Sequence, residues 1–142
     1  MNSTQKNEPS PRISRILVVD DEVSFTRLLK LNLEATGRYE VLTENNPLVA
    51  LPAAIYFKPD IVLMDVMMPG LDGGDVASRF GEHPELMDIP IIFLTATVRH
   101  SEVDERHGEI GGLHFLSKPV SMPELLGCLD EHFSGRRDLH HA

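Results

Sequence analysis

The sequence has a single cysteine, no tryptophan and no hydrophobic run of membrane-spanning length. One cysteine excludes an internal disulfide, and with no cysteine cluster a structural zinc site is not expected. Cys128 lies in the apolar run Leu125–Leu129, which favours a buried small side chain over a redox-active thiol. Residues 1–14 contain no apolar stretch of the kind found in signal peptides. We therefore expect a cytoplasmic protein without membrane insertion.

Basic residues are also scarce, with 13 Lys and Arg against 22 Asp and Glu and a formal net charge of −9. An acidic surface repels phosphate backbones, so direct binding of nucleic acid by this chain is not expected. A hydrophobic content of 42% in 142 residues is enough for the core of one domain. We expect a flexible N-terminal extension over 1–13, one domain over 14–134 and a C-terminal tail over 135–142.

Short aliphatic runs alternate with segments of helical periodicity along the chain. Nearly continuous apolar strands are typical of a parallel sheet covered by helices on both faces. The alternation predicts an α/β protein, a flavodoxin-like (βα)5 three-layer sandwich with five parallel strands in the order 2-1-3-4-5. The strand runs are Ile16–Val19, Tyr39–Thr43 (weaker), Asp60–Met64, Ile89–Leu94 and Leu113–Leu116, and the helical segments are 22–36, one from Asn46, 73–80, 98–108 and one from Ser121.

Several residues predict how these helices begin, pack and bend. Asn46 and Pro47 are a typical cap and first helical residue, and Pro52, about a turn later, is expected to kink the helix. Ser121 and Glu124 form a capping-box pattern at the start of the last helix. One apolar face of the first helix is expected to be buried, namely Phe25, Leu28, Leu29 and Leu33.

Polar residues stand at the carboxyl ends of four predicted strands: Asp20-Asp21, Asp65, Thr95 and Lys118. In a parallel sheet these ends share one edge, so the side chains should converge. Like charges about 4 Å apart repel by about 4 kcal/mol at an effective dielectric near 20, so either the carboxyl pKa values rise or a cation binds. Ligands that are all oxygen select a hard cation, and Mg²⁺ fits a site that keeps several waters.

The same residues have the chemistry of a phosphoryl site. Lys118 would supply a positive charge and Thr95 a hydroxyl donor for phosphoryl oxygens, while Asp65 attacks in line. Asp65 is the best nucleophile candidate because it follows the most buried strand, and the Asp20-Asp21 pair is interpreted as the metal clamp. Gly70 is a candidate for close backbone access to the site. Taken singly, each residue also has an ordinary interpretation as a cap, turn or surface charge.

The combination resembles a response-regulator receiver domain of two-component signalling, over about residues 14–134. The resemblance implies that Asp65 is the phosphoacceptor and that Asp20, Asp21 and the Met67 backbone carbonyl help bind Mg²⁺. The motifs that carry it are Val18-Val19-Asp20-Asp21-Glu22, Leu63-Met64-Asp65 with Met68-Pro69-Gly70, Leu94-Thr95-Ala96 and Ser117-Lys118-Pro119.

The resemblance further makes Thr95 the switch hydroxyl and Lys118 the phosphate partner, with a cis Lys118–Pro119 bond. Phe115 stands where the family has a switch aromatic, here without a tyrosine hydroxyl, and is expected to be buried. Such a protein is a signalling phosphoacceptor that catalyses only its own phosphorylation and dephosphorylation. The implied partners are a histidine kinase or histidine phosphotransfer protein and a downstream protein. Segment 98–108, the last strand and the last helix form the expected output face, which is also a candidate surface for homodimerisation.

Two other functions compete with this one. The first is a degenerate receiver that acts as a constitutive protein-interaction module. Such a protein has no need of the Asp, Thr and Lys residues, so the presence of the complete set argues against it. A haloacid-dehalogenase-like phosphatase usually has a second Asp two residues after its nucleophile, where this chain has Met67 and so lacks the proton donor. His100 and His107 lack the paired spacing of a metal site, His140 and His141 belong to the tail, and all seven histidines are interpreted as surface residues.

Overall fold

A computed structural model of the chain describes residues 13–68, 73–96, 109–110 and 113–141. Its strands form a sheet in the order β2-β1-β3-β4-β6-β5. Since β6 is the fifth of the longer strands, the predicted flavodoxin-like fold with strand order 2-1-3-4-5 is confirmed. The described elements are β1 (Ser14–Val19), α2 (Val23–Glu34), β2 (Tyr39–Glu44), the 3-10 helix η1 (Pro47–Val49), α3 (Ala50–Phe57), β3 (Ile61–Asp65), α4 (Gly73–Glu82), β4 (Ile91–Thr95), β5 (Glu109–Ile110), β6 (Leu113–Ser117) and α6 (Met122–His141).

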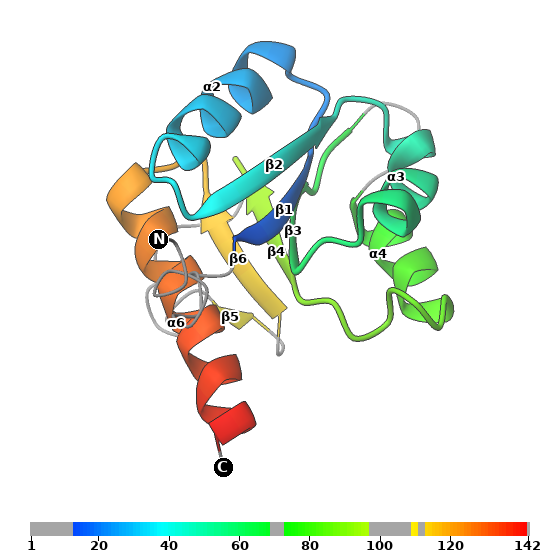
Figure 1. The fold of residues 1–142 in the computed structure, drawn as a ribbon. Helices are drawn as coiled ribbons and strands as arrows, with labels where there is room; N and C mark the ends of the chain where they lie inside the picture. Colours follow the sequence, from blue (N-terminus) through cyan, green and yellow to red (C-terminus); the bar gives the residue numbers. More distant parts are fainter. Residues whose placement is uncertain (1–12, 69–72, 97–108, 111–112, 142) are drawn as a thin grey trace, which may run out of the picture. The chain divides into compact units, whose positions relative to one another are not determined.

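The chain divides into two compact units, Met1–Ile91 and Ile92–Ala142. In the first unit, β1 pairs in parallel with both β2 and β3, so β1 is the central strand of the three. Every residue of β3 is buried, as are the four apolar residues of β1, Ile16–Val19. Figure 1 shows why, since α2 lies on one side of these strands and α3 and α4 lie on the other.

The buried face of α2 differs from the predicted one by part of a turn. Leu29 and Leu33 are buried as expected, but Leu28 is 56% exposed and Thr26 is buried in its place. Each residue turns a helix by about 100°, which places Leu28 well away from the line through Thr26, Leu29 and Leu33. Leu28 therefore faces solvent.

The start of the next helical segment is as predicted in one respect and different in another. The Asn46 side chain caps it by accepting a hydrogen bond from the Leu48 N–H at 3.0 Å, and Pro47 is its first residue. The chain then forms one 3-10 turn before α3 begins at Ala50. Pro52 thus lies in the first turn of α3, where its missing N–H costs no helical hydrogen bond, rather than inside a kinked helix.

In the second unit, β4 pairs in parallel with β6, and the two-residue β5 adds an antiparallel edge beside β6. β5 is too short to give a sequence pattern. α6 begins after Ser121, whose hydroxyl accepts a hydrogen bond from the Glu124 N–H at 3.4 Å, as the capping-box pattern predicts, and it continues to His141. The predicted helix over 98–108 lies outside the described residues. Among the described helices, none is long and apolar enough to cross a membrane.

Candidate functional site

The first unit brings three carboxylates together at the carboxyl ends of β1 and β3. Val19 pairs with Met64 in the parallel register, so the residues that follow, Asp20 and Asp65, are neighbours. Asp21 adds a third carboxylate, and one oxygen of each lies within 4.8 Å of the others. The cluster of Asp20, Asp21 and Asp65 is called the acidic cluster below.

Burial makes the acidic cluster electrostatically demanding. Asp20 is 0% exposed and Asp65 is 5% exposed, while Asp21 is partly exposed. Backbone amides offset part of the negative charge, because the Glu22 N–H donates to Asp20 Oδ1 at 2.9 Å and the Met67 N–H donates to Asp65 Oδ1 at 3.3 Å. The donor set is entirely oxygen, which is the chemistry that Mg²⁺ prefers. The residues present therefore fit a magnesium ion.

The loop between β1 and α2 is held by a residue that the sequence did not single out. Asn45 donates from its side-chain amide to the Asp20 carbonyl at 2.8 Å and to the Thr26 hydroxyl at 3.0 Å. The Asp20 N–H in turn donates to the Glu44 carbonyl at 3.1 Å. The end of β2 thus fixes the backbone that carries the first carboxylate. A polar residue directly after a strand was the available signal, but it equally indicates a turn.

The segment after Asp65 is packed against the start of α4. The Gly73 N–H donates to the Val66 carbonyl at 2.8 Å. A Cβ on Gly73 would overlap the Asp65 carbonyl oxygen and would lie 3.0 Å from Val66 Cα. Gly73 therefore allows the close backbone approach for which the sequence suggested Gly70, a residue outside the described ones. Met67 points outward, with 62% of its surface exposed.

The second unit carries the remaining predicted site residues. Thr95 is the last residue of β4 and is 1% exposed. It pairs with Ser117 of β6, and the Lys118 N–H donates to the Thr95 carbonyl at 3.0 Å. The cis Lys118–Pro119 bond implied by the resemblance is present. Within this unit the two strand ends that carry the hydroxyl and the amine are therefore joined.

Phe115 is less buried than predicted. Its ring stacks on the ring of Phe93, with centroids 5.3 Å apart and an interplanar angle of 27°, yet the residue remains partly exposed. β6 has the short edge strand β5 as its other neighbour. Phe115 thus stacks on Phe93 while part of its surface stays exposed.

Comparison with known proteins gives a consistent result. The family described as the response regulator receiver domain matches residues 16–130. The chain is 42% identical over 112 residues to the alkaline phosphatase synthesis transcriptional regulatory protein PhoP of Bacillus subtilis, with 78% of this chain covered and 45% of PhoP. It is 32% identical over 111 residues to the polar-differentiation response regulator DivK of Brucella anthropi, with 78% of this chain covered and 89% of DivK. The chain thus spans less than half of the length of PhoP.

Solved structures show the same fold. The chemotaxis protein CheY4 of Vibrio cholerae matches with a TM-score of 0.72 and 27% identity, over 84% of this chain and 98% of that one. A putative response regulator from Chloroflexus aurantiacus matches with a TM-score of 0.71 and 30% identity, over 84% and 97% of the two chains. This chain therefore belongs to the family of response regulator receiver domains.

Proposed function

We propose that Asp65 accepts a phosphoryl group, in a reaction that depends on Mg²⁺, and that its phosphorylation changes a protein-binding surface. The donor would be a phosphohistidine of a histidine kinase or a histidine phosphotransfer protein. The observation that carries the proposal is the acidic cluster, in which Asp65 lies beside Asp20 and Asp21 with all three carboxylates within 4.8 Å. Membership of the receiver family supports the same assignment.

Asp65 is the carboxylate suited to attack. Asp20 is fully buried and Asp21 is on the loop after β1, whereas Asp65 ends β3 with its main chain fixed by the contacts of Val66 and Gly73. In the proposed step an oxygen of Asp65 forms a bond to phosphorus while the bond from phosphorus to the histidine nitrogen breaks. The imidazole leaves with the electron pair of that bond and takes up a proton, and an acyl phosphate remains on Asp65.

The acidic cluster and the Met67 carbonyl would hold the magnesium ion. When bound, Mg²⁺ would offset the negative charge of the three carboxylates and of the phosphoryl oxygens. The chain's own part is to keep these oxygens in place, which the hydrogen bonds from Glu22 and Met67 support. Mg²⁺ is thus a cofactor of the proposed phosphorylation.

Thr95 and Lys118 are proposed to bind the phosphoryl oxygens through hydroxyl and ammonium groups. Their main chains are hydrogen-bonded to each other, so a displacement of Thr95 on phosphorylation would also move the start of the Lys118–Pro119 segment. Phe115, two residues before Ser117 on the same strand, would then change its packing on Phe93. These movements would alter the face formed by β6 and α6, to which a downstream protein would bind, and that face remains a candidate for homodimerisation.

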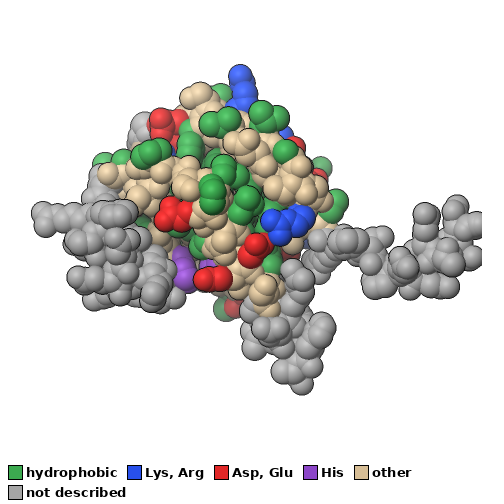
Figure 2. Space-filling view, turned by 90° about the vertical axis from the view of Figure 1, so that its left-hand side faces the viewer, with side chains coloured by type: hydrophobic (Ala, Val, Ile, Leu, Met, Phe, Trp, Pro, Cys, Tyr) green, Lys and Arg blue, Asp and Glu red, His purple; other side chains and the backbone are tan. Residues whose placement is uncertain are grey.

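The surface of α2 is suited to contact the phosphoryl donor. α2 begins two residues after Asp21, and its solvent side carries three exposed apolar residues, Val23 (51%), Leu28 (56%) and Leu31 (67%). About 100° per residue places these three on one broad band opposite Leu29 and Leu33. Figure 2 shows hydrophobic side chains exposed on the side of the molecule where α2 lies. We infer that a donor that covers Asp65 also contacts this band.

The competing proposal is a constitutive interaction module. It predicts partner binding that is independent of the state of Asp65, and the complete set of Asp20, Asp21, Asp65, Thr95 and Lys118 argues against it. Turnover of an external phosphate ester is disfavoured because Met67 offers no proton to a leaving group.

The decisive experiment adds a small phosphodonor such as acetyl phosphate, with or without Mg²⁺, and follows intact mass. We expect the mass of one phosphoryl group on wild type and on Asp88→Asn, an exposed control with the same chemical change, only when Mg²⁺ is present. Asp65→Asn should stay unmodified. Modification of Asp65→Asn to the wild-type extent, or none in wild type, would contradict the proposal. Many rounds of phosphate release per chain would instead indicate a phosphatase.

The α2 surface is tested by comparing two donors. Leu31→Asp should slow transfer from a phosphorylated histidine phosphotransfer protein that modifies the wild type, yet leave the acetyl phosphate reaction unchanged. Met87→Asp is the matched control, since Met87 is 58% exposed outside α2. Equal transfer to both variants would remove α2 from the donor surface without affecting the role of Asp65.

A further inference from the structure

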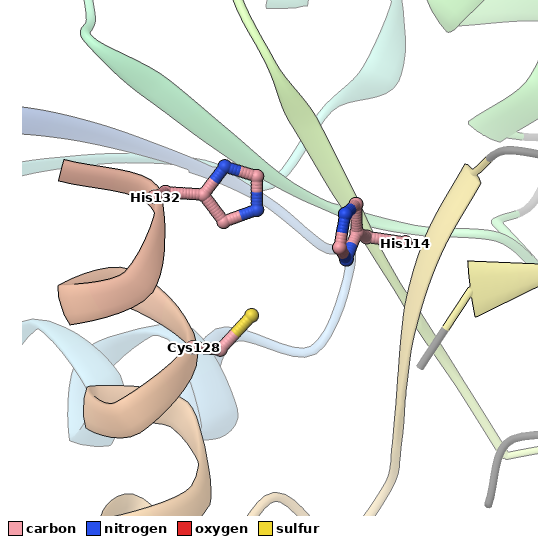
Figure 3. Close-up of side chains that lie close together, drawn as sticks. All are labelled: His114, Cys128 and His132. Atoms are coloured by element: carbon pink, nitrogen blue, oxygen red, sulfur yellow. The ribbon is translucent and has the colours of Figure 1, made fainter. Parts of the chain in front are cut away.

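A second group of metal-binding side chains lies between β6 and α6. Figure 3 shows His114 on β6 facing Cys128 and His132 on α6. One ligand atom of each residue lies within 4.8 Å of the others, and all three residues are half-buried. Cys128 and His132 are four residues apart, so α6 presents them on one face. This group, called the His-Cys-His cluster below, shares no residue with the acidic cluster.

The geometry corrects the interpretation of these residues from sequence. His114 and His132 are not solvated surface residues, because their rings pack edge to face with centroids 4.8 Å apart and the Nε2 atom of His132 is buried. Cys128 is not simply an apolar core residue either, since its sulfur lies close to the rings of both histidines (Figure 3). The cluster is not evident from the sequence spacing, because 13 residues without a motif lie between His114 on the strand and Cys128 on the helix.

The donor set selects a class of metal different from that of the acidic cluster. Two imidazole nitrogens and one sulfur suit Zn²⁺ and similar transition metals, whereas Mg²⁺ and Ca²⁺ require oxygen. Zn–N bonds of about 2.0–2.1 Å and a Zn–S bond of about 2.3 Å place the tetrahedral nitrogen and sulfur ligand atoms about 3.3–3.6 Å apart. The present separation of at most 4.8 Å leaves only a small side-chain rotation to reach that arrangement.

We propose that His114, Cys128 and His132 form a zinc-binding site, with water in the fourth coordination position. The two histidines would bind as neutral imidazoles and Cys128 as a thiolate. When zinc binds, the S–H bond of Cys128 is replaced by a Zn–S bond and the proton passes to solvent. Bound zinc would tie α6 to β6, because each element supplies at least one ligand.

Without metal, Cys128 favours its protonated thiol form over the reactive thiolate. Burial and the nearby carboxylates of Glu131 and Glu124 raise the pKa of Cys128 to about 11. Zinc binding nevertheless releases the proton of a coordinating thiol, as it does from other protonated ligands.

Cobalt is the probe that separates this site from other histidines. The whole chain, freed of metal with a chelator, is titrated with Co²⁺ and then with Zn²⁺. We expect a sulfur-to-cobalt charge-transfer band together with the strong visible bands of tetrahedral cobalt, both removed by one equivalent of Zn²⁺. Because the sequence has one cysteine, the charge-transfer band reports on Cys128 alone.

Three variants and a control test each ligand. Cys128→Ser should abolish the charge-transfer band, and His114→Gln and His132→Gln should weaken Zn²⁺ affinity by more than about 100-fold, since loss of a group that merely supports a ligand already costs about 10–100-fold. His83→Gln is the matched control, because His83 lies in a turn outside the cluster and accepts a hydrogen bond from the Glu85 N–H. Circular dichroism verifies that each variant is folded.

The proposal is overturned if wild type gives no sulfur-to-cobalt band, or if Cys128→Ser and His83→Gln bind Zn²⁺ equally well. Asp65→Asn should bind Zn²⁺ like wild type, so this result does not depend on whether Asp65 is phosphorylated. Conversely, Cys128→Ser should still be phosphorylated by acetyl phosphate.

Discussion

Gly73 and Val66 are joined by a backbone hydrogen bond of 2.8 Å, and this contact places the first residue of α4 directly against the chain that carries Asp65. Any side chain at position 73 would overlap the Asp65 carbonyl oxygen. We predict that Gly73→Ala destabilises the fold by about 1–3 kcal/mol, the usual cost of forcing atoms into a packed site. The measurement is the urea midpoint of unfolding, read together with the rate of phosphorylation by acetyl phosphate.

Gly81 is the matched control for that change. It lies in the same helix, and a Cβ there would meet nothing within 4 Å. Gly81→Ala should therefore stabilise the protein by up to about 1 kcal/mol through helix propensity. Equal destabilisation by both substitutions would show that alanine destabilises α4 at either position and that the contact with Asp65 is not responsible.

Magnesium should stabilise the folded chain through the acidic cluster. At a Mg²⁺ concentration ten times its Kd, binding to the native state alone adds about 1.4 kcal/mol to the free energy of unfolding. Asp20→Asn should lose most of this gain while remaining folded without metal, because an asparagine Oδ1 can still accept the Glu22 N–H and one repelling charge is gone.

Thermal unfolding with and without Mg²⁺ measures the effect, and chelation of the metal should reverse it. Asp88→Asn, which alters an exposed carboxylate, should respond like wild type. A magnesium gain that survives in Asp20→Asn would place the ion elsewhere.

Glu34 gives a pH-dependent contribution to stability. Its carboxylate accepts the Val41 N–H and the Lys30 ammonium, each at 3.0 Å, and so links α2 to β2. The Val41 N–H has the largest effect and, together with Lys30, holds the pKa of Glu34 below its usual 4.5, while burial, the second-largest effect, opposes them. A lowered pKa means that the stabilisation is complete above pH 4.5 and disappears as pH falls through the lowered value.

Glu34→Gln should therefore lower the free energy of unfolding at neutral pH by about 1 kcal/mol. This value is small because the Glu34 carboxylate is partly exposed and solvent weakens its interactions. The difference from wild type should shrink below pH 4.5. Urea unfolding over a pH series measures both effects. Glu82→Gln, at an exposed helix end, should show neither, and a difference that grows in acid would refute the assignment.

Met67 offers a test of how long the acyl phosphate survives. Its side chain is 62% exposed and has no polar group with which to orient a water near Asp65. We predict that Met67→Asn shortens the lifetime of the phosphorylated state about tenfold, which corresponds to about 1.4 kcal/mol of barrier. Loss of the phosphoryl mass with time gives the rate, and Met87→Asn, an equally exposed methionine outside the site, should keep the wild-type lifetime. An unchanged lifetime in Met67→Asn would show that residue 67 does not control hydrolysis of the acyl phosphate.

The strands were the most predictable part of this fold. β1 and β3 are covered on both faces, which requires continuous apolar residues and leaves a plain signal in the sequence. The helices were less so, because an apolar residue on a helix says nothing of which side has a neighbour. Leu28 has the same chemistry as Leu29 and lies about 100° away, and only the packing of α2 on β2 decides that one is exposed.

The site shows the same division. Asp20, Asp21 and Asp65 were identified because parallel strands bring their carboxyl ends to one edge. Asn45 escaped notice because its amide joins two elements, and such a bridge has no local pattern. His114 belongs to no recognisable metal motif for the same reason: the other two members of its cluster, Cys128 and His132, lie on a different element, α6.

Successive residues of a strand face opposite sides, and on β6 this separates two rings that are covalent neighbours. The Phe115 ring stacks on Phe93, while the His114 ring faces Cys128 and His132. A shift of the β6 backbone at this point changes both sets of contacts together. A ligand bound on one side of the strand would be coupled to packing on the other to the extent that it shifts this backbone, and any such coupling is equal in both directions.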